Sequence, residues 1–184
     1  MARSDVALRA ARRAYERAHV VAALRGLAIA TGITLLAIGL HRTTNVTYLM
    51  AAALAATLAT LGWRGGAMRR GAIGGVIAGL PPLFAPVVVF AFSHAGHCPD
   101  CMMKPTLTCM LACFGTSSLV GLFVGRIAAR DPSPKRYAAA AIGTAMLTGL
   151  LGCATTGFAG ALGIIGGLVA GSVTGWVMLY PRRA

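Results

Sequence analysis

Residues 160–180 read GALGIIGGLVAGSVTGWVMLY, an uncharged run that is long enough to cross a bilayer and repeats glycine at every fourth position. The repeated positions are Gly163, Gly167, Gly171 and Gly175. Glycines spaced by four lie on one face of a helix, where the missing side chains let another backbone approach closely. The stretch predicts a membrane-spanning helix packed on a neighbour, which is either another span of the same chain or a second copy in a homo-oligomer.

The rest of the chain shares this apolar character. It has 184 residues, of which 57% are hydrophobic and 11% charged, and its mean hydropathy is +0.75. This composition is outside the range of soluble domains. The net charge of +13 could suggest a nucleic-acid partner. A nucleic-acid binder gathers Lys and Arg on a folded soluble face, however, and here they lie between apolar runs. We expect a membrane protein with no direct nucleic-acid contact.

Six apolar runs predict an all-α membrane protein, a glycine-packed bundle of six transmembrane helices over residues 20–184. Gly71, Gly75 and Gly79 form a second close-packing stripe, and three prolines, Pro81, Pro82 and Pro86, predict a kink after it. The expected spans cover about 20–40, 46–63, 72–93, 106–125, 137–157 and 160–180.

The positive charges predict the topology. Fourteen of the 17 Lys and Arg residues lie in the first 19 residues, in the 64–71 and 126–136 loops and at the C terminus. The alternate loops carry only Arg42 and Lys104. Because cytoplasmic segments are enriched in Lys and Arg, both termini are expected in the cytoplasm of a bacterial inner-membrane protein. The 94–104 loop then faces the periplasm.

Residues 1–19 predict a basic amphipathic helical arm, with apolar residues at steps of three and four. Two interpretations stay open: an arm lying on anionic headgroups of the bilayer, or one that docks a cytoplasmic regulatory protein. Arg25 follows inside the first span, where its long side chain can reach the headgroups. The arm residues expected to contact a partner are Arg9, Arg12, Arg13 and Arg17.

The chemistry-bearing stretch is HAGHCPDCMMKPTLTCMLAC, residues 94–113, which holds four of the five cysteines. Cys109 and Cys113 share a helix face because they are four residues apart. The expected topology places Cys153 at a similar depth on another span. All five cysteines are thus predicted to converge on the outer third of the bundle. The candidate ligands are His94, His97, Cys98, Cys101, Cys109, Cys113 and Cys153.

Three interpretations of this cluster stay open. Thiolates with His are soft ligands that suit Cu(I) or Zn(II). The CPDC spacing of Cys98 and Cys101 is also that of redox motifs, and an oxidising exterior permits a disulfide. The cysteines could alternatively be structural, as a plain Cys98–Cys101 disulfide and three small buried hydrophobes.

The residue content favours a regulator over an enzyme or an ion-coupled transporter. The expected spans contain no Asp, Glu or Lys, so the carboxylate proton relays of many transporters are missing. No nucleotide loop or nucleophile elbow occurs, although a thiol–disulfide enzyme stays open. We expect a soft-metal or redox sensor that signals to the cytoplasm. The alternative is a small heavy-metal transport or thiol–disulfide exchange protein.

The six-span plan, with both ends cytoplasmic, a short N-terminal helix and cysteines toward the periplasm, resembles the NrsF-like membrane anti-sigma factors. The resemblance lies in the architecture of the whole chain. It implies that residues 1–19 contact a sigma factor and that Cys113 and Cys153 take part in sensing.

Overall fold

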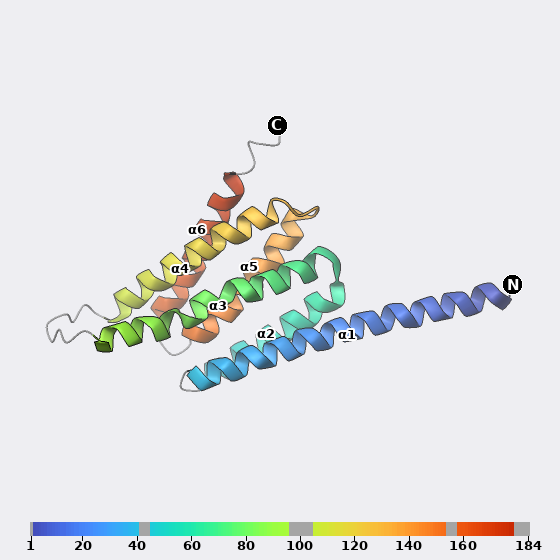
Figure 1. Cartoon of the computed structure of the whole chain (residues 1–184), viewed down its shortest axis with the longest axis horizontal. Coiled ribbons are helices and arrows are strands. Elements are labelled where there is room, and N and C mark those ends of the chain that lie inside the picture. Colours follow the sequence, from blue (N-terminus) through green and yellow to red (C-terminus); the bar gives the residue numbers. More distant parts are fainter. Residues whose placement is uncertain (1, 41–44, 96–104, 154–157, 179–184) are drawn as a thin grey trace.

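The computed structural model describes residues 2–40, 45–95, 105–153 and 158–178. Side chains are described in these ranges except at 2–11, 40, 89–95, 105–109, 153 and 158–159. The described chain is helical and contains no strand. Its helices are α1 (Ala2–Leu40), α2 (Asn45–Arg64), α3 (Gly66–Ala95), α4 (Pro105–Ala128), α5 (Pro134–Cys153) and α6 (Phe158–Val177) (Figure 1).

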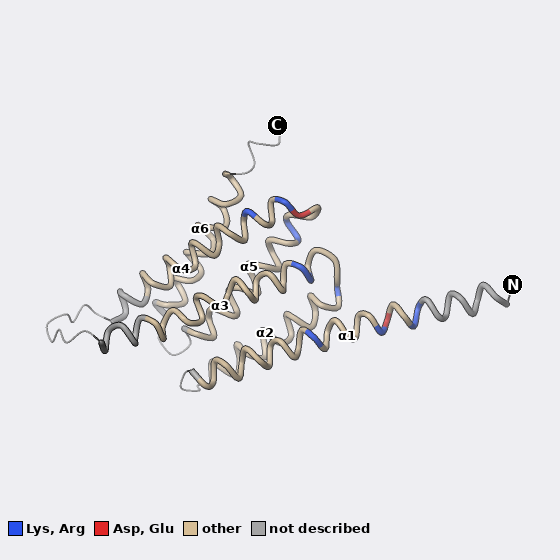
Figure 2. The backbone as a smooth tube through the Cα atoms, viewed as in Figure 1, with Lys and Arg blue, Asp and Glu red and all other residues tan. Residues whose placement is uncertain are grey.

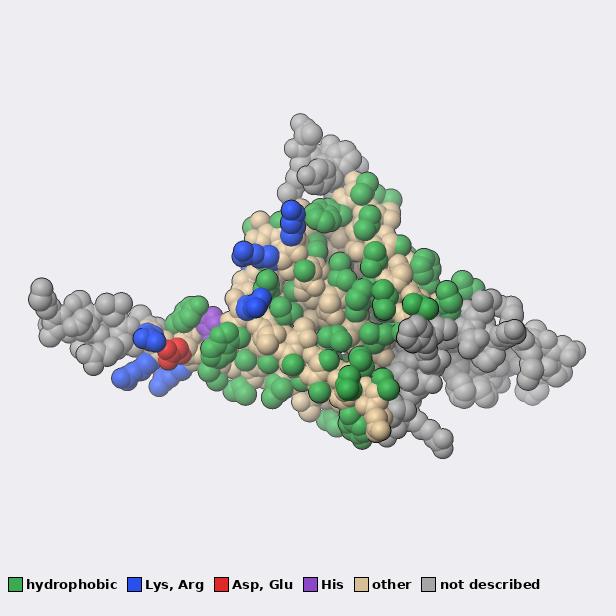
Figure 3. Space-filling model, turned by 180° about the vertical axis from the view of Figure 1, so that it is seen from behind, with side chains coloured by type: hydrophobic (Ala, Val, Ile, Leu, Met, Phe, Trp, Pro, Cys, Tyr) green, Lys and Arg blue, Asp and Glu red, His purple; other side chains and the backbone are tan. Residues whose placement is uncertain are grey.

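Five of the described helices are long and apolar enough to cross a membrane. The spanning parts are Arg12–Gly39 in α1, Asn45–Arg64 in α2, Gly66–Val88 in α3, Met110–Ala128 in α4 and Gly160–Val177 in α6. Large hydrophobic side chains point outward along them, among them Leu119 and Phe123, which are 71% and 65% exposed. The outer face is therefore apolar, as lipid contact requires (Figure 3).

Helix α5 differs from the other five because protein surrounds it. It packs most extensively on α3 and also contacts α1, α2, α4 and α6. No residue from Ala140 to Gly152 is exposed. Its sequence is rich in Ala, Gly and Thr, and Lys135 and Arg136 lie in its first turn. A helix covered by protein has no need of large lipid-facing side chains.

The glycine ladder of α6 packs on α4. Of the two neighbours that the sequence allowed, another span of the same chain or a second copy, this is the first. A Cβ built at Gly163 would lie 2.7 Å from the carbonyl oxygen of Met110, and one at Gly167 would lie 2.5 Å from that of Phe114. Gly171 faces the backbone of Ser118 in the same way. The ladder is thus covered within the chain and is not open to a second copy.

The second glycine stripe packs α3 on α5. Gly71 and Gly75 face the backbone carbonyls of Tyr137 and Ala141. Thr144, on the same face of α5, is fully buried and donates a 3.2 Å hydrogen bond to the carbonyl oxygen of Ala72. Close packing at the start of this span is therefore confirmed. Helix α3 continues through all three of its prolines, so they do not end it.

Several helices extend beyond the predicted spans. The arm and the first span form one continuous helix, α1, which projects past the bundle (Figure 1). The two loops expected at 64–71 and 126–136 are shorter. Gly65 alone separates α2 from α3, and both Gly65 and Gly66 have the positive φ that favours glycine (66° and 59°). Residues 129–133 connect α4 to α5.

Candidate metal and redox site

The cysteine-bearing helix ends lie at one end of the bundle. Cys109 is in the second turn of α4, and Cys153 is the last residue of α5. Gly149 of α5 faces Ile164 of α6, which packs in one cluster with Cys113 of α4. Cys109 and Cys153 each lie four residues, or about 6 Å, beyond this level toward the same end. The backbone thus brings these cysteine positions to a similar depth.

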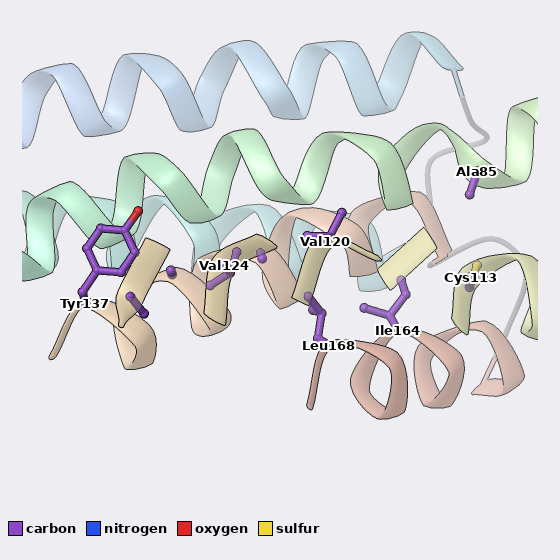
Figure 4. Close-up of a cluster of buried hydrophobic side chains, with 10 residues drawn as sticks. Ala85, Cys113, Val120, Val124, Tyr137, Ile164 and Leu168 are labelled. Atoms are coloured by element: carbon purple, nitrogen blue, oxygen red, sulfur yellow. The ribbon is translucent and has the colours of Figure 1, made fainter. Parts of the chain in front are cut away.

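Cys113 is the cysteine whose side chain the structure describes. It is fully buried and packs in the seam between α4 and α6. A Cβ built at Gly163 would lie 3.4 Å from the Cβ of Cys113. Figure 4 shows Cys113 near Ala85 and Ile164, at the opposite end of the hydrophobic cluster from Tyr137. A change at this sulfur would therefore act directly on the packing of α4 against α6.

The side chains of the remaining candidate ligands are outside the described set. His97, Cys98 and Cys101 lie outside the described residues, as do the side chains of His94, Cys109 and Cys153. Among the side chains that are described, no group of three or more His, Cys, Asp or Glu residues could hold a metal ion. The predicted seven-residue cluster therefore stays a prediction.

Ser117 is a polar residue near the site that the sequence did not single out. It lies one turn along α4 from Cys113, is fully buried, and its hydroxyl has no hydrogen-bond partner. Its Cβ packs against the backbone of Gly167 in the same seam. The spacing of four from Cys113 was the available signal, because it places both side chains on one helix face.

The described charges lie at the other end of the bundle and along α1 (Figure 2). There Arg70 of α3 forms a two-pronged ion pair with Asp131, with distances of 2.9–3.2 Å. The carboxylate also accepts a 2.9 Å hydrogen bond from the backbone N–H of Ser133. This backbone bond, aided by Arg70 and opposed by desolvation, holds the pKa of Asp131 below its ordinary value.

Of the arm residues expected to contact a partner, three have described side chains, Arg12, Arg13 and Arg17, and all are exposed. Arg12 pairs with Glu16 at 3.1 Å, as the spacing of four predicts. Arg9 is helical in the backbone, and its side chain lies outside the described set. The arm thus presents positive charge away from the bundle.

Comparison of the chain with protein-family models, curated proteins and solved structures found no match.

Proposed function

We propose that the protein is a six-span inner-membrane regulator with both termini in the cytoplasm. Its periplasmic Cys/His cluster would bind a soft metal such as Cu(I) or Zn(II), or change redox state. The α1 arm would pass the response to a cytoplasmic partner such as a sigma factor, as the resemblance to NrsF-like proteins implies. Heavy-metal transport and thiol–disulfide exchange are the alternatives.

The observation that carries this proposal is the separation of chemistry along the bundle. The described charges of the helix connections, including Arg70 and Asp131, lie at one end, with the arm projecting from it. The cysteine-bearing ends of α4 and α5 lie at the other. A stimulus at one end and a response at the other is the arrangement that a transmembrane signalling protein needs.

The position of α5 gives the proposal a route between the two ends. Cys153 ends this helix, and α5 contacts every other helix of the bundle. An axial shift or rotation of α5 would therefore disturb α1 and α2 as well as α3. Cys113 offers a second route through the α4–α6 seam.

Tight packing of α3 on α5 and of α4 on α6, called the two glycine seams below, favours regulation over transport. At Gly75 and Gly171 the facing backbone is so close that a single added carbon would overlap it. These two interfaces, as described, leave no room for an ion to pass between their helices. Transport would require them to open.

Metal analysis of the purified protein together with thiol counting tests the cluster. Wild type should bind one soft metal, and both Cys101→Ser and Cys109→Ala should lose it to a similar degree, because a four-donor site fails whichever donor is removed. Met146→Leu, which removes a sulfur from the middle of α5, is the control and should bind as wild type does.

A metal-free wild type with one Cys98–Cys101 disulfide and three unreactive thiols would contradict metal binding. Reversible oxidation that alters arm accessibility would then support the redox form of the proposal. Labelling of Cys98 or Cys101 by a membrane-impermeant thiol reagent only after cell lysis would contradict the topology.

A further inference from the structure

Two adjoining cavities lie between α1, α2 and α3 near the charged end of the bundle. One is an apolar groove of about 370 Å³, lined along its length by Ile29, Ile73 and Val76. The other is a cavity of about 370 Å³ with a more polar lining that includes His19 and Arg64. Both are lined by Ala22, Gly62 and Arg69, so the two cavities adjoin one another.

Small residues create this space. A Cβ built at Gly62 would lie 3.0 Å from the carbonyl oxygen of Ala22, and one at Gly26 would lie 2.8 Å from that of Leu58. These contacts hold α1 close to α2, and Ala22, Gly26 and Gly62 form the part of the groove lining that has little or no side chain. The site is thus a consequence of how the two helices pack.

The site carries positive charge without a matching negative one. Arg25 and Arg69 line the groove, and Arg69 and Arg64 line the adjoining cavity. Among the described residues, no Asp or Glu lines either cavity. The two described carboxylates are engaged elsewhere, Glu16 with Arg12 and Asp131 with Arg70. Charge complementarity therefore calls for an anion at the junction of the two cavities.

The depth of the site matches the headgroup level of a membrane. Trp63, a residue typical of the membrane interface, lies next to Arg64 at the end of α2 and contacts His19 edge-on, with ring centroids 5.9 Å apart. Arg25 lies three residues, or about 4.5 Å, deeper than Ala22. Side chains on a helix lean toward its N-terminus, so Arg25 extends back toward that level.

We propose that this site binds one anionic phospholipid. Arg69 contacts the phosphate at the junction of the two cavities, with Arg25 and Arg64 on either side of it. One acyl chain lies in the groove along Ile29 and Ile73, both of which are partly exposed to the lipid phase. A soluble phosphate would leave this groove unfilled. The proposal does not depend on the cysteine cluster or on its metal.

The test uses the full-length protein, delipidated in a neutral detergent and titrated with phosphatidylglycerol. Phosphatidylcholine with the same acyl chains and inorganic phosphate serve as separate arms. Bound lipid is counted by native mass spectrometry, and the thermal midpoint is followed in parallel. Phosphatidylglycerol should bind at a stoichiometry of one and raise the midpoint, whereas the other two should not.

Arg25→Gln with Arg69→Gln should weaken phosphatidylglycerol binding about thirtyfold, since each basic residue near an anionic lipid contributes roughly a factor of five. Arg13→Gln with Arg17→Gln removes the same charge from the exposed arm and should bind as wild type does. If both double variants weaken phosphatidylglycerol binding equally, net charge alone determines binding and the proposed site is wrong.

Ile73→Trp keeps every charge, fills the groove and provides a second test if the arginine variant does not fold. Ile73 is 43% exposed, so the larger ring can be accommodated by a folded protein. Lipid binding should fall in this variant. Unchanged binding would overturn the acyl-chain groove, and an equal response to inorganic phosphate in wild type would overturn the lipid as the ligand.

Discussion

The α4–α6 and α3–α5 seams both pack two helices closely through glycine, but in different surroundings. In the α4–α6 seam, glycines of α6 meet the backbone of α4, and Gly121 and Gly125 of α4 meet α6 in return. In the α3–α5 seam, glycines of α3 and Gly152 of α5 meet the facing backbone, and α5 also supplies the buried hydroxyls of Thr144 and Thr148. One seam is backbone on backbone, and the other adds hydrogen bonding.

The surroundings explain the difference. Helix α6 is peripheral and exposes Leu162, Val169 and Val173, and its contact with α4 is close van der Waals packing of backbone on backbone. Helix α5 is covered by protein, so its hydroxyls find carbonyl partners and are never left in lipid. A peripheral helix can move outward into lipid when its seam is disturbed, whereas a central one cannot.

The largest predicted effect is therefore in the central seam. In Gly75→Ala the added carbon would overlap both the carbonyl oxygen of Ala141 and the hydroxyl of Thr144. We expect a loss of roughly 2–3 kcal/mol in the free energy of unfolding, measured by denaturation in mixed micelles. Gly143→Ala on α5 is the control, because its Cβ meets nothing within 4 Å. Equal stability of the two variants would mean that the seam is not close-packed.

The peripheral seam should be less sensitive to the same change. Gly171→Ala would push against the backbone of Ser118, but α6 can shift outward, so we expect a loss of roughly 1–2 kcal/mol. Gly166→Ala is the matched control on the same helix, since its Cβ would lie 3.6 Å from the Phe114 ring in ordinary contact. A larger loss of unfolding free energy in Gly171→Ala than in Gly75→Ala would contradict the prediction that the peripheral seam is less sensitive.

One substitution removes the inter-helix hydrogen bond that distinguishes the two seams. Thr144→Val keeps the shape of the side chain and loses its bond to Ala72, together with its bonds to Ala140 and Ala141 within α5. Loss of the inter-helix bond should cost about 0.6 kcal/mol. Thr174→Val is the control, because the exposed Thr174 hydroxyl bonds only to the carbonyl of Ala170 within its own helix. If both variants lose the same stability in micelles, the inter-helix bond contributes nothing of its own.

The smallest effect concerns the ion pair between Arg70 of α3 and Asp131 of the α4–α5 connection, which lies at the charged end of the bundle. Because the pKa of Asp131 is lowered in the folded protein, its contribution is complete above the ordinary value of 3.8 and is lost as pH falls through the lowered pKa. Asp131→Asn should therefore lower the thermal midpoint slightly at neutral pH, with the difference from wild type shrinking in acid. A difference that grows on acidification would contradict this sign.

The sequence predicted the helical fold and the glycine contacts because both depend on local patterns. Spacing by four alone placed Gly163, Gly167 and Gly171 on one face. The apolar run at about 137–157 was recognised in the same way, but the packing of α5 against all five other helices was not. Its central position depends on tertiary packing, which no local window contains.

Helix lengths and the paired arginines were harder to predict. The expected loops began where the apolar runs stop, yet α3 already includes Arg69 and Arg70, because a helix can continue beyond the bilayer. No glycine or proline separates the arm from the first span, so their continuity could have been predicted. Arg25 and Arg69 lie far apart in sequence and share a cavity only because α1, α2 and α3 pack together. Of the candidate metal ligands, only Cys113 has a described side chain.

The unbroken course of α1 makes the N-terminal arm a lever. About 30 Å of helix extends from the Ala22–Gly62 contact to the N-terminal end, at 1.5 Å per residue. The contacts at its foot involve glycine, which gives the helix a pivot with little side-chain interlocking. A tilt of about 10° at that pivot would move the tip by about 5 Å over this length. A small rearrangement among the transmembrane helices would thus become a larger displacement at the N-terminal end of the arm.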